Sequence, residues 1–181
     1  MRIYWLYLGD DGTFVKDPKF GVDPINYNLE KINNSANLGT YIKTNNSINV
    51  KYLNGKSEKW NIEYLNGKIN TIDGLYSSMQ SSLPGNFKLN GSFSGSLFTE
   101  NVASLQTYIF KNDGTVTIKG LGAIRNNVTN ATAKSTTTGT YTISGNTLHI
   151  HLTSKPEMVA VIGFLPGDKP SIIINDQIFK G

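Results

Sequence analysis

The chain has 181 residues, with 17 basic and 13 acidic side chains, two histidines and no cysteine. This length suits one ordinary domain or two small ones of about ninety residues each. The net charge of only +4, with lysines scattered along the chain, argues against a nucleic-acid-binding protein, which needs a concentrated basic stripe. The missing cysteine excludes disulfides, thiol catalysis and zinc thiolate sites.

The sequence repeats itself with a period of about one hundred residues. Four separate blocks return in the same order: 7–14 as 109–116, 39–41 as 139–141, 48–52 as 148–152, and 64–68 as 164–169. Such a repeat predicts two copies of one supersecondary unit. We expect a first unit over 1–78, a linker over 79–86 and a second unit over 87–181.

Alternation with a period of two residues predicts strands in the first copy. Ile48, Val50 and Tyr52 share one face of a strand at 47–52, and the next apolar run starts at Trp60. Asn-Gly pairs follow both runs, and such pairs favour tight hairpin turns. Helical spacing is absent, so at most one short helical turn is expected, near 77–83.

The second copy follows the same plan, and its last two strands are expected at 158–165 and 171–179. In both copies a long irregular stretch is expected between two strands, at 16–38 and at 120–138. The second copy opens with an additional strand at 87–98 that has no counterpart in the first. Either the natural chain extends further toward its N-terminus, or the first unit has an open sheet edge that something must cover.

The fold class expected from these patterns is all-β, with two tandem antiparallel meanders. An aromatic strand ending in Asp-Gly-Thr, then Gly-Thr-Tyr, a short turn and an alternating strand, resembles the small lipocalin-like domains of exported bacterial proteins. The resemblance implies small barrels or flattened sandwiches, sometimes with an apolar pocket. It also implies a secreted, periplasmic or cell-surface protein whose signal has been removed; the chain as written would be cytoplasmic.

Aromatic side chains are the candidate ligand-binding residues, and they are concentrated in the first copy: Trp5, Tyr7, Tyr41, Tyr52, Trp60 and Tyr64. Large rings in a small β unit commonly form its core. The alternative is a pocket or platform for a hydrophobic ligand or a sugar ring.

The pattern of titratable residues indicates no catalytic, metal or cofactor site. His149 and His151 share one face of a strand, but their counterparts Asn49 and Lys51 lie on the polar face, which favours solvent exposure. The aspartates before Gly-Thr are expected to cap turns.

An interface is predicted on the strand at 158–165, because Val159 and Val161 make both of its faces apolar. The other copy, a partner protein or a second protomer should cover them. The leading functional hypothesis is a non-enzymatic binding or interaction module that takes a small apolar ligand, a glycan or a protein. The alternatives are a structural or assembly domain of a larger exported protein, and an isomerase or cyclase acting in a barrel pocket.

Overall fold

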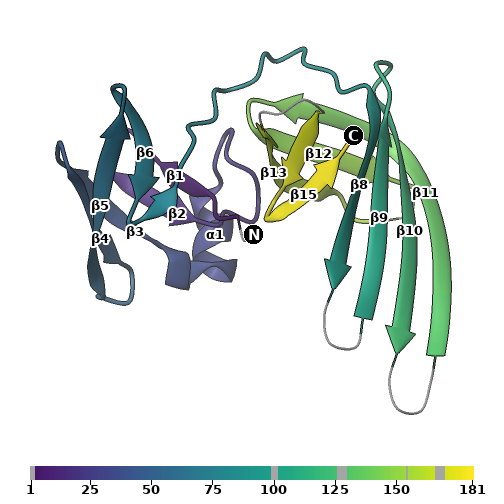
Figure 1. Ribbon diagram of the computed structural model, residues 1–181, viewed down its shortest axis with the longest axis horizontal. Coiled ribbons are helices and arrows are strands. Elements are labelled where there is room, and N and C mark those ends of the chain that lie inside the picture. The colour runs from purple at the N-terminus through teal and green to yellow at the C-terminus, as the bar shows by residue number, and fades with distance from the viewer. Residues whose placement is uncertain (1–2, 99–101, 126–129, 154, 166–169) are drawn as a thin grey trace.

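A computed structural model describes residues 3–98, 102–125, 130–153, 155–165 and 170–181. The fold is all-β, and its two tandem antiparallel units stand next to each other, joined by a long linker (Figure 1). This arrangement confirms the predicted fold class. No helix among the described residues is long and apolar enough to cross a membrane.

The first unit is an open sheet in which each strand pairs with its neighbours in the sequence. Its strands are β1 (Leu6–Leu8), β2 (Thr13–Lys16), β3 (Leu38–Lys43), β4 (Ser47–Tyr52), β5 (Ser57–Leu65), β6 (Lys68–Ile72) and β7 (Leu75–Tyr76). Between β2 and β3 lie the helix α1 (Tyr27–Asn33) and the single 3-10 turn η1 (Ser35–Asn37).

The second unit is a closed barrel of eight strands. They are β8 (Gly91–Phe98), β9 (Val102–Phe110), β10 (Thr115–Arg125), β11 (Asn130–Ser144), β12 (Thr147–Leu152), β13 (Met158–Leu165), β14 (Ser171–Ile174) and β15 (Gln177–Lys180). Closure occurs where β15 meets β8, with Lys180 opposite Ser94.

Equivalent hydrogen bonds show that the repeat in the sequence is a repeat in the structure. The N–H of Tyr41 donates to Gly12 O, and the N–H of Tyr141 donates to Gly114 O, both at 2.8 Å. Gly39 and Gly139 each lie so close to the carbonyl of the facing strand that a Cβ could not fit. The strands β1 to β7 therefore correspond to β9 to β15, and within the part of the chain that the structure describes β8 alone has no counterpart.

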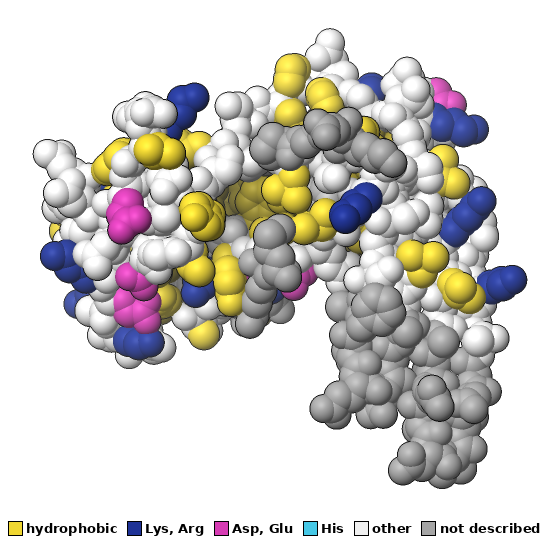
Figure 2. Space-filling view, in the orientation of Figure 1, with side chains coloured by type: hydrophobic (Ala, Val, Ile, Leu, Met, Phe, Trp, Pro, Cys, Tyr) yellow, Lys and Arg dark blue, Asp and Glu magenta, His cyan; other side chains and the backbone are white. Residues whose placement is uncertain are grey.

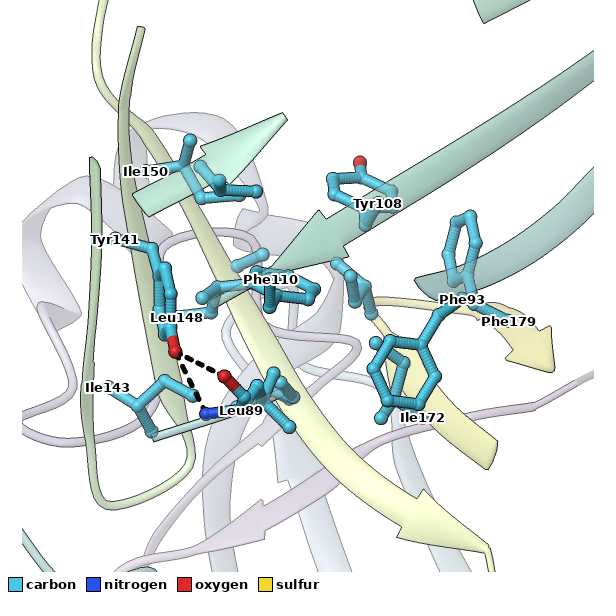
Figure 3. Packing of buried hydrophobic residues seen from close by; sticks show 14 residues of the cluster. Leu89, Phe93, Tyr108, Phe110, Tyr141, Ile143, Leu148, Ile150, Ile172 and Phe179 are labelled. Carbon is cyan, nitrogen blue, oxygen red and sulfur yellow. Dashed lines mark hydrogen bonds between the residues drawn. The ribbon is translucent and has the colours of Figure 1, made fainter. Parts of the chain in front are cut away.

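The barrel interior is filled with side chains. Alternate residues of its strands point inward and form one buried apolar cluster, in which the Tyr141 hydroxyl accepts the N–H of Leu89 at 2.9 Å (Figure 3). Aromatic rings make up much of this cluster: the ring centroids of Phe110 and Tyr141 are 4.9 Å apart, and those of Tyr108 and Phe179 are 5.0 Å apart. The barrel is thus a packed core.

Three local predictions were wrong. A helix forms at Tyr27–Asn33, whereas 77–83 is not helical. The stretch 120–138 is not irregular where it is described, because β10 and β11 continue through it as a long hairpin that projects beyond the barrel (Figure 1). The expected final strand at 171–179 is two strands, separated by a turn at Asn175 and Asp176.

A buried carboxylate explains the unexpected helix. Glu30 is the buried residue of α1, with no exposed surface, and its Oε1 accepts the N–H groups of Lys19 and Phe20. Its Oε2 accepts the side-chain amide of Asn34 at 2.8 Å. Asn26 caps the start of the helix by accepting the N–H of Leu29. The helix therefore depends on tertiary contacts more than on its own apolar face.

Candidate functional site

The aromatic residues predicted as a site do not gather in one pocket. Tyr52 and Trp60 are buried and pack edge-to-face against Phe14, with centroids 5.2 and 5.7 Å away, in the apolar core of the first unit. Tyr41 packs against this core from one side, and its hydroxyl donates to Gly9 O at 3.0 Å. Ligand binding by these rings remains a prediction.

The other three aromatic candidates lie elsewhere. Tyr7 contacts Tyr27 edge-to-face at 6.4 Å, next to the helix. Tyr64 is 44% exposed near the end of β5. Trp5 reaches the second unit, where its indole N–H donates to Asn175 O.

A carboxylate joins the two buried rings at the rim of the first unit. Glu58 Oε2 accepts hydrogen bonds from Tyr52 Oη and from Trp60 Nε1, both at 2.9 Å, and Oε1 pairs with Lys56 Nζ at 2.6 Å. These three donors hold the pKa of Glu58 well below its usual range, at about 2. Burial, followed by the hydrogen bond to Glu58, raises the pKa of Tyr52 to about 12. Because the Tyr52 hydroxyl and the Trp60 N–H both donate to Glu58, this carboxylate fixes the orientation of the two rings.

The face of β13 predicted as an interface is covered. Val161 has no exposed surface although it lies outside the apolar cluster of the barrel, and Val159 is half-buried. Two residues further on, Gly163 lies against Trp5 and Gln80, and the Gln80 side chain accepts the N–H of Phe164 at 3.1 Å. The first unit and the linker therefore dock on this side of the barrel.

A buried hydroxyl completes the contact between the units. Thr147 Oγ1 accepts the backbone N–H groups of both Val22 and Asp23, each at 2.7 Å. Close approach leaves no room for a Cβ at Gly145, which would collide with the Asp23 side chain. The long segment between β2 and β3 is thus held against the barrel and connects the two units.

The two histidines lie on the outer face of β12, as predicted. Glu157 Oε1 is 2.8 Å from His149 Nδ1 and 3.2 Å from His151 Nε2. Within the described part of the chain, no group of three or more His, Cys, Asp or Glu side chains is placed to hold a metal ion. The aspartates before Gly-Thr cap their turns: Asp11 Oδ1 accepts the N–H of Thr13 at 3.0 Å, and Asp113 Oδ1 that of Thr115 at 2.8 Å.

The open side of the first unit is the feature that distinguishes it from the barrel. In the barrel, β8 lies between β9 and β15. In the first unit the equivalent place lies between β1 and β7, and among the described residues β1 pairs with β2 alone and β7 with β6 alone. Both strands of this side are sheet edges, which natural proteins usually cover.

Apolar side chains mark the open side. Leu75 is 57% exposed and Tyr76 is 90% exposed on β7. Leu6 and Leu8 of β1 are half-buried and pack against the core of the unit. Figure 2 also shows apolar side chains gathered in the hollow between the two units. We call Leu6, Leu8, Leu75 and Tyr76 the open edge of the first unit.

None of these four residues was among those predicted to form a site. A signal was nevertheless present, because the missing counterpart of β8 left an open sheet edge in the first unit as one of two alternatives. The exposure of Leu75 and Tyr76 could not be deduced from the sequence, because the turn before them and the linker after them are polar and show no alternation of buried and exposed positions.

No protein-family model, curated protein or solved structure matches this chain. Function must therefore be argued from the site alone.

Proposed function

We propose that this chain is a non-enzymatic interaction module, in which the packed barrel is a scaffold and the first unit binds a protein partner. The observation that carries the proposal is the open edge: among the described residues, the seven-stranded sheet has no counterpart of β8, the strand that closes the barrel. Unpaired strand edges flanked by exposed apolar side chains are typical of protein interaction sites.

Packing favours a protein over a small apolar ligand. The inward-facing side chains of the barrel fill its interior, and the rings of the first unit contact one another. Two surface depressions among the described residues are open: one lies over Thr40, Asn49 and Lys59 of β3 to β5, and the other lies over 24–28. Small-molecule sites are usually deeper and more enclosed.

A peptide library displayed on phage and selected on the intact chain tests this proposal. We expect enriched peptides that bind the chain and lose at least tenfold in affinity for the double variant Leu75→Ser/Tyr76→Ser. Leu105→Ser is the matched control, because Leu105 is an exposed apolar side chain of the barrel. Peptides that ignore the open edge but lose binding to the control variant would place the site on the barrel and overturn the proposal.

The second candidate is a structural or assembly domain. The docking of the two units through Thr147, Trp5 and Gln80 favours it, because that contact makes one body of two units. If selection enriches no peptide while native mass spectrometry shows a defined oligomer, the structural role replaces the interaction module.

A further inference from the structure

We infer that the open edge binds its partner by strand addition: an extended segment of another polypeptide pairs with β1 in the place that β8 occupies in the barrel. This inference rests on the proposed function and names the class of partner. Four features of the two units carry it.

The first feature is the direction of the free backbone groups. Trp5 O accepts the N–H of Asp17, and Gly9 N donates to Thr13 O, both at 2.8 Å, so the odd positions of β1 face β2. The N–H and C=O groups of Leu6 and Leu8 therefore face the open edge. In the barrel the corresponding residues, Tyr108 and Phe110, pair with Phe93 and Gly91 of β8.

The second feature is the tyrosine that anchors the segment before β8. The Tyr141 hydroxyl donates toward Lys111 O at 3.0 Å and also contacts both the N–H and the carbonyl of Leu89. Its counterpart Tyr41 donates to Gly9 O at the same distance. Among the described residues, nothing donates to the Tyr41 oxygen, so it retains an acceptor for the backbone N–H of an incoming strand.

The third feature is the size of the side chains that an added strand would contact. Phe93 points from β8 into the barrel core, 6.2 Å from Phe110 between ring centroids. In the first unit Leu6 and Leu8, the counterparts of Tyr108 and Phe110, are both smaller. The partner strand should therefore carry a large apolar residue at the Phe93 position.

The fourth feature is a difference between the place that β8 occupies in the barrel and the equivalent place beside β1 in the first unit. Gly95 of β8 has no room for a Cβ because the carbonyl oxygen of Ile178 and the ring of Phe179, both on β15, lie against it. By register Phe179 corresponds to Ser77, since Phe179 lies opposite Ile172 and the Ser77 N–H donates to Asn70 O at 2.9 Å. In the barrel, pairing with β15 imposes both contacts, so glycine is required at this position. A strand that pairs with β1 of the open sheet alone meets neither the carbonyl of a closing strand nor a phenyl ring, so the first unit should accept a larger residue two positions after the aromatic one.

This difference provides a selective probe. A labelled synthetic peptide with the sequence of residues 88–98 and the change Gly95→Leu should bind the full chain at one peptide per chain. Its binding should perturb the amide resonances of Leu6, Leu8 and Tyr41. The same peptide carrying Phe93→Ser should bind at least tenfold more weakly, and so should one with an N-methyl group on Phe93, which blocks pairing with β1.

Variants of the protein complete the test. Leu8→Pro removes an N–H that makes no hydrogen bond among the described residues and should abolish peptide binding. Leu8→Ala loses the side chain but keeps the N–H, and should bind the peptide at least tenfold more tightly than Leu8→Pro. Binding that survives N-methylation, that perturbs Ser94 and Lys180 instead, or that is absent from a folded chain would overturn strand addition. Dimerisation that the peptide cannot compete with would assign the edge to a second copy and also overturn it. If selected peptides still need Leu75 and Tyr76 but tolerate Leu8→Pro, strand addition fails while the interaction module stands.

Discussion

The indole N–H of Trp60 donates a hydrogen bond to Oε2 of Glu58, which lies on the same face of β5, at 2.9 Å. The same oxygen accepts the Tyr52 hydroxyl, so one partly exposed carboxylate fixes two buried rings. This relationship connects the stability of the first unit to pH.

The first unit should lose stability in acid through Glu58. Its pKa is lowered from 4.5 to about 2 in the folded chain, so its charged form is favoured by folding. That contribution is complete above pH 4.5 and disappears as the pH falls toward 2. After allowance for solvent screening, we expect Glu58→Gln to cost about 1 kcal/mol at pH 7.

Denaturant unfolding of Glu58→Gln and the natural chain, measured from pH 7 to pH 2, checks this expectation. The two free energies of unfolding should converge in acid. A constant difference across that range would show that the charge of Glu58 does not matter.

The barrel should respond at the opposite end of the pH scale. Burial raises the pKa of Tyr108 from 10.0 to about 12, which means that folding favours the neutral phenol. Stability from this residue is complete below pH 10 and is lost as the pH rises through 12. We expect Tyr108→Phe to be nearly neutral at pH 7 and to be more stable than the natural chain by roughly 2 kcal/mol at pH 12.

Unfolding curves of both proteins between pH 8 and pH 12, followed by circular dichroism, measure this difference. Identical losses in the two proteins would mean that Tyr108 does not contribute to alkaline unfolding.

Much of the fold could be predicted because a strand that buries one face has apolar and polar residues in alternation. Ile48, Val50 and Tyr52 alternate with polar residues, and all three are buried. The absent counterpart of β8 left two alternatives, a longer natural chain or an open sheet edge, and the described residues form an open sheet. Where neither face is buried the signal fails: in β11, residues 132–136 are exposed on both faces, so no alternation marks the strand.

The helix α1 was not predicted from the sequence for a different reason. Its seven residues are too few for a helical period, and Leu29 and Ile32 are exposed. What holds it is the buried Glu30 carboxylate, which accepts N–H groups from a segment about ten residues earlier. Contacts of this kind cannot be read from local spacing, and the position of the candidate site on the open edge depends on the same long-range information.

The core role of Trp60 predicts a large loss on truncation. Trp60 is 9% exposed and contacts Phe14, so Trp60→Ala should cost about 3 to 5 kcal/mol. The matched control is Tyr64→Ala, which removes a largely exposed ring and should cost less than about 1 kcal/mol. Chemical denaturation followed by tryptophan and tyrosine fluorescence gives both values. Equal, small costs for the two variants would remove Trp60 from the core and revive the hypothesis of an aromatic binding pocket.

The docking of the two units should depend on one hydroxyl. Thr147 is buried, and its Oγ1 is the acceptor for the N–H groups of Val22 and Asp23. Thr147→Val keeps the shape of the side chain but leaves both N–H donors without an acceptor. This change should lower the free energy of unfolding by about 1 to 3 kcal/mol and should speed amide exchange at Val22 and Asp23. Thr147→Ser keeps the hydroxyl, which the first unit already carries at the equivalent Ser47, and should retain most of the stability. Hydrogen exchange that is equally slow at Val22 and Asp23 in both variants would mean that the segment is held by contacts other than this oxygen.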